Sequence, residues 1–99
     1  MSAQLNKRSK RLIDQTNRIG IDFLLADLNT GLTFLQVAHV TGSPSNRSRS
    51  FDRAYEVYRT VTRLMPRVVL TPDAQLEIGQ KLADLRNELE KAGYTCSQN

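Results

Sequence analysis

The sequence predicts an all-α fold, in which three helices form an up-down-up antiparallel bundle behind a disordered basic N-terminal arm. Apolar residues recur at three- and four-residue steps in three long segments, and this spacing is typical of a buried helix face. Short connections separate the segments, and such connections favour antiparallel neighbours. A chain of 99 residues is long enough for one domain at most.

The arm is predicted to cover residues 1–18. It is polar and basic, with five cationic side chains at Lys7, Arg8, Lys10, Arg11 and Arg18. Residues 11–19 are ambiguous, because their three apolar residues could also extend the first helix. Gly20 argues against that extension, since a glycine inside a helix is about 1 kcal/mol less favourable than an alanine.

The first helix is predicted at about Ile21–Thr41, with a buried stripe of Ile21, Leu24, Leu25, Leu28, Leu32, Leu35 and Ala38. Phe23, Phe34 and Val37 widen the apolar surface beyond this stripe. We therefore expect this helix to contact two neighbours rather than one. Gly31, in mid-helix, indicates that another helix approaches closely at this point.

The second helix is predicted at about Pro44–Met65, with an apolar face of Phe51, Ala54, Tyr55, Tyr58, Val61 and Met65. Gly42 before it is a natural left-handed C-cap for the first helix. Ser43 is an expected N-cap, and the firm part of the helix is expected from Ser50. Pro66 cannot continue the helix and should end it.

The third helix is predicted at Pro72–Ala92, with a core stripe of Ile78, Leu82, Leu85, Leu89 and Ala92. Thr71 is an expected N-cap, and Gly93 followed by Tyr94 fits a Schellman end. The three-helix domain should thus cover residues 19–94, and residues 95–99 should form a tail. The apolar residues 68–70 before this helix either form a short extended segment or tuck under the bundle.

The sequence offers no set of residues for catalysis or for a cofactor. His39 is the single histidine and Cys96 the single cysteine, so one chain cannot assemble a zinc ligand set or a Ser-His-acid triad. Phosphate-binding glycine motifs are also missing from the sequence. We therefore predict that the protein is not an enzyme and uses no metal or other cofactor. A lone cysteine excludes an internal disulfide and suits the reducing cytoplasm, and no apolar run approaches the length of a membrane span.

Charge is distributed in blocks along the chain. The net charge is +4, and residues 1–19 and 46–67 each carry +4, whereas residues 20–45 and 68–99 each carry −2. Ten of the fourteen cations are arginine, which makes bidentate bonds to carboxylates and phosphates. Acidic protein, nucleic acid and anionic lipid are therefore candidate partners, and a solvated face that only keeps the protein soluble is the simpler interpretation.

These features favour a small helical module for protein–protein interaction, which binds a partner or itself through an apolar helix face while arginines steer an acidic partner. The residues expected to contact the partner are Phe23, Phe34, Val37, Val68, Val69, Arg53, Arg59, Arg63 and Arg67. The alternative is a nucleic-acid-binding accessory protein that uses the arginine-rich blocks. Against the alternative, the aromatic residues Tyr55 and Tyr58 fall on the apolar face and not among the arginines.

The second predicted helix resembles the second half of a tetratricopeptide repeat. The matching residues are Ala54, Tyr58, Val61 and Pro66, with Gly31 and Phe34 in the places of the glycine and aromatic of the first half. The chain departs from the family in having one unit and about ten more residues between the two halves than the repeat allows. The arrangement is also similar to the three-helix microtubule-interacting-and-transport domain. Either resemblance implies a groove between helices that binds a protein or peptide.

Overall fold

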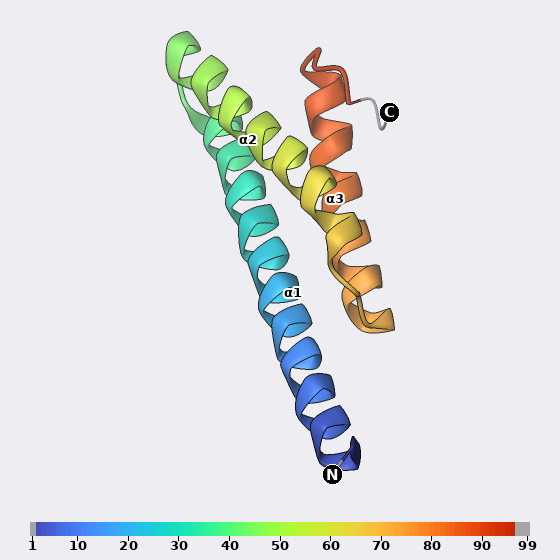
Figure 1. Cartoon of the computed structure of the whole chain (residues 1–99). Coiled ribbons are helices and arrows are strands. Elements are labelled where there is room, and N and C mark those ends of the chain that lie inside the picture. Colours follow the sequence, from blue (N-terminus) through green and yellow to red (C-terminus); the bar gives the residue numbers. More distant parts are fainter. Residues whose placement is uncertain (1, 97–99) are drawn as a thin grey trace.

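The computed structural model describes the backbone of residues 2–96 and the side chains of residues 10–96. The chain forms α1 (Ser2–Val40), α2 (Pro44–Leu64), the short 3₁₀ helix η1 (Met65–Arg67) and α3 (Pro72–Lys91). The helices run up, down and up, and α3 packs beside the half of α1 that also carries α2 (Figure 1). The predicted all-α three-helix fold is confirmed, and the described residues contain no strand.

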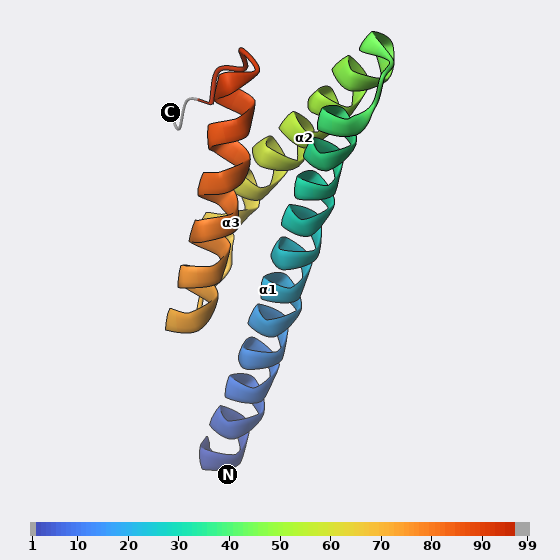
Figure 2. The ribbon, with the colours of Figure 1, turned by 180° about the vertical axis from the view of Figure 1, so that it is seen from behind.

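The structure differs from the expected arm, because α1 begins at Ser2 and continues through Gly20 without a break. Gly20 serves a contact rather than a helix end: a Cβ built on it would lie 3.0 Å from Cγ2 of Val68. Contact with the bundle begins one turn earlier, where Oδ1 of Asn17 accepts a hydrogen bond from the N–H of Val69 at 3.3 Å. Residues 10–16 are exposed, and this end of α1 runs past α2 and α3 in both ribbon views (Figure 2).

The core lies where the three helices meet. Its buried side chains are Leu24, Leu28, Leu35 and Ala38 from α1, Ala54, Val57, Tyr58 and Val61 from α2, and Ala74, Ile78, Leu82, Leu85 and Leu89 from α3. The predicted stripes supply most of these residues, although Ala92 is exposed because it is the C-cap of α3. The close approach expected at Gly31 is confirmed, since a Cβ there would lie 2.9 Å from Cγ1 of Val57.

Two predicted helix starts are confirmed by their hydrogen bonds. Oγ of Ser43 accepts from the N–H of Asn46 at 3.3 Å, and Oγ1 of Thr71 accepts from the N–H of Ala74 at 3.2 Å. These bonds satisfy donors that have no partner inside a helix. The predicted left-handed cap at Gly42 is wrong, because the turn is so tight that Ser43 already caps the next helix.

The C-terminal cap of α3 has the predicted geometry, and it leads the chain back to α2. Gly93 has a φ of +97°, and the N–H of Tyr94 donates to the carbonyl of Leu89 at 3.0 Å. Part of the predicted tail, residues 95–99, then packs on the bundle. The Tyr55 hydroxyl donates to the carbonyl of Thr95 at 3.0 Å, and the Cys96 side chain is buried. Residues 97–99 lie outside the described part of the chain.

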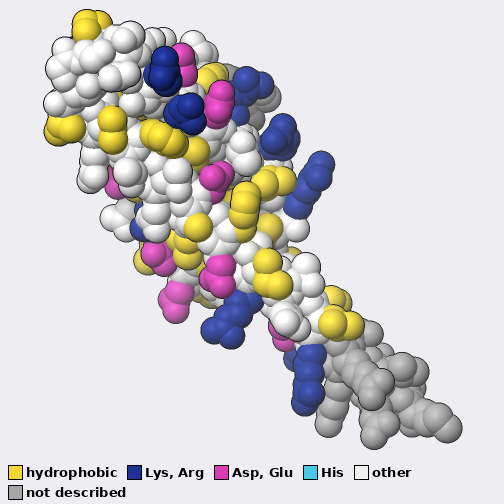
Figure 3. Space-filling view, turned by 90° about the vertical axis from the view of Figure 1, so that its left-hand side faces the viewer, with side chains coloured by type: hydrophobic (Ala, Val, Ile, Leu, Met, Phe, Trp, Pro, Cys, Tyr) yellow, Lys and Arg dark blue, Asp and Glu magenta, His cyan; other side chains and the backbone are white. Residues whose placement is uncertain are grey.

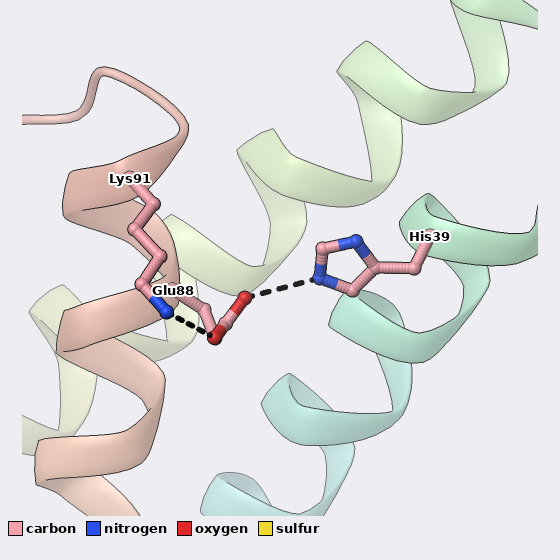
Figure 4. Close-up of polar contacts among 3 residues, drawn as sticks. All are labelled: His39, Glu88 and Lys91. Carbon is pink, nitrogen blue, oxygen red and sulfur yellow. Dashed lines mark hydrogen bonds and ion pairs between the residues drawn. The ribbon is translucent and has the colours of Figure 1, made fainter.

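A polar contact joins the upper ends of α1 and α3 (Figure 4). Nε2 of His39 lies 3.2 Å from Oε2 of Glu88, and Nζ of Lys91 donates to Oε1 of the same carboxylate at 3.3 Å. The hydrogen bond from Lys91 lowers the pKa of Glu88, and His39 adds to this effect. His39 is exposed on α1, and its contact with Glu88 reaches across to α3.

Candidate interaction site

Exposed apolar side chains concentrate on α1. Of the eight large hydrophobic residues exposed in the described part of the chain, six belong to this helix: Leu12, Ile13, Ile19, Phe23, Val37 and Val40. The other two are Val69, in the connection after η1, and Leu76, on α3. The bundle core already has its own buried side chains from α1, so these residues form a second apolar surface on the same helix.

Most of this surface is one continuous line of residues, which we call the α1 seam: Leu12, Thr16, Ile19, Phe23, Ala26, Thr30, Thr33, Val37 and Val40. The steps between them alternate between four and three residues, so they share one side of the helix. All nine are exposed and none is charged. Figure 3 views the side of the molecule away from α3, where hydrophobic side chains recur along the long axis.

The seam contains two of the apolar residues predicted to contact a partner. Phe23 is 51 % exposed and Val37 is 42 % exposed. A third, Phe34, is half-buried at the edge of the seam, next to Thr33. The guanidinium carbon of Arg53 lies 5.9 Å from the centroid of the Phe34 ring, in a cation–π contact, which places one predicted arginine beside the seam.

The remaining predicted residues lie elsewhere. Val68 packs against Gly20, and the backbone of Val69 bonds Asn17 on the side of α1 that faces the bundle. Arg59 and Arg63 border a different feature, an open cavity of about 810 Å³ lined by Tyr55, Glu56, Tyr58, Thr60, Thr62, Met65, Leu82 and Thr95. Arg67 is exposed in η1. The structure therefore places four of the nine predicted residues at the seam or its edge, two at the cavity and three at neither surface.

The tyrosines at this cavity hold the C-terminal segment in place. Tyr58 is 3 % exposed, and its ring lies nearly parallel to that of Tyr55, with centroids 6.5 Å apart. Tyr55 also packs against Tyr94, with ring centroids 5.0 Å apart. Burial raises the pKa of Tyr58 and that of the Cys96 thiol beside it. These groups are part of the packing and not free to stack on a ligand.

The described residues lack the features of two other kinds of site. Nowhere in them do three or more His, Cys, Asp and Glu side chains gather in a way that could hold a metal ion. No helix in the same part of the chain is long and apolar enough to cross a membrane. Comparison with known protein families, with curated proteins and with solved structures finds no match.

The sequence-based prediction missed the lower half of the seam. Leu12 and Thr16 belong to the predicted disordered arm, residues 1–18. Ile19 and Val40 lie inside the predicted domain but were not among the expected contact residues. The signal that could have found them is the alternation of four- and three-residue steps, which continues across Gly20 from the arm into the helix.

Proposed function

We propose that the protein is a helical module for protein–protein interaction, which uses the α1 seam to bind a partner or a second copy of itself. The observation that carries this proposal is the seam itself, an uncharged line of exposed side chains on a helix whose opposite side already supplies the core. The seam spans residues 12–40, about 43 Å of helix, and a strip about 10 Å wide along it covers about 400 Å². An exposed apolar patch of that size often marks an interaction site.

One arginine beside the seam supports steering of an acidic partner. Arg53 lies against Phe34 at the edge of the seam, and the chain carries a net charge of +4. Charges at the rim of an interface raise the rate of association more than they raise the affinity. A cytoplasmic location is part of the proposal, because a single cysteine buried in the fold has no disulfide partner in the chain.

The test compares matched substitutions on the seam and away from it. Phe23→Glu places a charge in the middle of the seam, whereas Leu76→Glu places one on α3 at a residue that is 74 % exposed. Tagged full-length chains would be cross-linked in native lysate after circular dichroism has confirmed that both variants are folded. We expect the wild type and Leu76→Glu to retain the same proteins and Phe23→Glu to lose them. Equal retention by all three chains would refute a role for the seam.

Nucleic-acid binding is the second candidate, because Arg59 and Arg63 border one open cavity and Arg67 follows on η1. This function predicts a gel shift with mixed DNA and RNA at about 50 mM salt, and an affinity that falls steeply at higher salt. Binding should weaken in Arg59→Ser and stay unchanged in Phe23→Glu. No shift at low salt would rule this candidate out. If the partner instead bound in a groove between helices, as the resemblance to tetratricopeptide or microtubule-interacting-and-transport domains implies, substitutions in that groove would abolish binding and Phe23→Glu would not.

A further inference from the structure

We propose that the α1 seam binds a second copy of this chain, with the two α1 helices antiparallel and Asp22 of each copy beside Lys81 of the other. This inference rests on the proposed function, since it takes the seam to be a binding surface, and it names the occupant and the register. Four properties of the seam support this dimer: its period, its hydroxyl groups, the sizes of its side chains and the charges along its edges.

The period of the seam is that of a two-stranded coiled coil. Steps of four and three residues make a seven-residue repeat, which keeps one side of a helix against a partner helix when the pair winds around each other. Positions a of this repeat are Thr16, Phe23, Thr30 and Val37, and positions d are Leu12, Ile19, Ala26, Thr33 and Val40. The repeat runs over about four heptads, and six of its nine positions are apolar while three are threonine. A heptad pattern of this length favours a coiled coil.

The threonines of the seam do not oppose burial. Their hydroxyls donate to carbonyls of their own helix, at 2.8 Å from Thr16 to Leu12, 3.0 Å from Thr30 to Ala26 and 2.9 Å from Thr33 to Asn29. A hydroxyl that is already hydrogen-bonded can leave water without becoming an unsatisfied buried group. The seam can therefore be covered by an apolar surface along its whole length.

Side-chain sizes favour the antiparallel arrangement. When a positions face d positions of an antiparallel partner, the two residue numbers in each layer add up to 49. Phe23 then faces the partner's Ala26, so the largest side chain of the seam meets the smallest. In a parallel pair in register, Phe23 would instead face the partner's Phe23, and Ala26 would face the partner's Ala26. The first layer would be overcrowded and the next would contain a gap.

Charges along the edges favour the same arrangement. In a parallel pair, Asp22 would approach the partner's Asp27 on both sides, and the two basic N-terminal segments would lie together. In the antiparallel pair, Asp22 lies opposite the partner's Asn29. Nζ of Lys81 donates to Oδ1 of Asn29 at 2.6 Å. The ammonium group of Lys81 therefore lies close to the position of the partner's Asp22 carboxylate in the antiparallel pair. Within one chain the carboxylate paired with Lys81 is that of Glu77, at a longer 3.9 Å.

A second copy also explains the length of α1. Residues 10–16 extend beyond the bundle with every side chain exposed, and a helical segment without packing is only marginally stable in water. In the antiparallel pair this segment lies along the upper half of the partner's α1, where Leu12 faces the partner's Val37. The same arrangement brings Ile13 beside the partner's half-buried Phe34, at the edge that Arg53 covers. One surface thus supplies both members of every contact, as a two-fold symmetric interface requires.

The decisive experiment exchanges the charges of the predicted contact. Sedimentation equilibrium would measure the dimer dissociation constant of the full chain alone, of Asp22→Lys, of Lys81→Glu and of an equimolar mixture of the two variants. Each variant alone places like charges together at two symmetric contacts, and we expect its dimer to be about tenfold weaker than the wild type. The heterodimer that forms in the mixture has opposite charges at both contacts, because the two substituted residues meet at one contact and the unchanged Asp22 and Lys81 meet at the other. We therefore expect its affinity to be close to that of the wild type.

Two controls separate this contact from a general effect of charge. Asp14→Lys makes the same change on the same helix, at an exposed residue outside the seam, and it should leave the dissociation constant unchanged. The heterodimer of Asp14→Lys with Lys81→Glu should stay weaker than the wild-type dimer, because one of its two contacts still places Asp22 beside a carboxylate. Phe23→Glu should abolish the dimer, since it buries an unpaired charge in the central layer.

The outcomes distinguish this inference from the proposed function. A wild-type chain that stays monomeric at high concentration refutes the dimer, and the seam still serves another protein if Phe23→Glu loses partners in lysate. A dimer that survives Phe23→Glu uses another surface and refutes the inference. A dimer that Phe23→Glu abolishes but the charge exchange does not restore refutes the antiparallel register.

Discussion

Gly31 and Gly79 make a matched pair of positions at which the same substitution should have opposite effects. Both lie inside helices, where replacing glycine by alanine contributes about 1 kcal/mol through helix propensity alone. At Gly79 of α3 no atom lies within 4 Å of the added Cβ apart from the local backbone and the residues next to it in the chain. We therefore expect Gly79→Ala to stabilise the fold by about 1 kcal/mol, which raises the melting temperature by roughly 4–8 °C.

At Gly31 the same methyl group meets the neighbouring helices. It would lie 2.9 Å from Cγ1 and 3.2 Å from Cβ of Val57, and 3.3 Å from Cδ2 of Leu85. The Cβ of a valine is fixed to the backbone, so α1 and α2 must separate slightly. Overpacking of this kind costs about 1–3 kcal/mol, which outweighs the gain in propensity. We expect Gly31→Ala to destabilise the fold by about 1 kcal/mol, a difference of about 2 kcal/mol from Gly79→Ala.

Urea unfolding followed by circular dichroism, at one protein concentration for all variants, measures both effects. A third variant tests the cause: Val57→Ala removes Cγ1, the closest atom, and keeps Cβ, so Gly31→Ala should destabilise that background less than it destabilises the wild type. The coupling between the two positions should be about 1–2 kcal/mol. If Gly31→Ala stabilises the wild type as much as Gly79→Ala does, the helices do not approach closely at this point and the reasoning fails.

Three further predictions concern single side chains. Thr71→Ala removes the oxygen that accepts from Ala74, and should lower the free energy of unfolding by about 1 kcal/mol, whereas Thr71→Ser should retain most of it. Burial and the hydrogen bond to Asp52 raise the pKa of Tyr94 to about 12 from 10.0, so its contribution to stability is complete below pH 10 and is lost as the pH rises through 12. Titration followed by ultraviolet absorbance should show one tyrosine that ionises near pH 12 and is missing in Tyr94→Phe. Ionisation of Tyr94 near pH 10 would contradict the raised pKa. The buried Cys96 thiol, whose pKa burial raises, should react slowly with a disulfide reagent until urea unfolds the chain, and equal rates in both states would refute its burial.

The candidate site was only partly predictable from the sequence. Phe23 and Val37 stood out because they widen the apolar surface of a helix that already has a complete core stripe. Val68 was grouped with them on hydropathy alone, and it packs against Gly20 inside the molecule. The predicted arginines of α2 also lie on different surfaces, with Arg53 beside the seam and Arg63 at the cavity. The position of a residue around its own helix does not determine which neighbouring element it contacts.

Local spacing by itself determined the helices, most of their buried stripes and two of their N-caps. These features depend on the turn of a helix and on side chains a few residues apart, so a short stretch of sequence contains them. Ser43 and Thr71 are examples, since each oxygen bonds a backbone N–H three residues later.

Only the tertiary structure decided which apolar residues of α1 are covered and which stay exposed. From the nearby sequence alone, residues 11–20 could form either an arm or a helix. In the structure they are helical, and Gly20 and Asn17 contact the connection before α3. The sequence indicated that Cys96 belongs to a tail, whereas in the structure it is buried and its carbonyl accepts a hydrogen bond from Tyr58 of α2. In each case the deciding contact joins residues about forty or more positions apart, and such contacts exist only after the helices have packed.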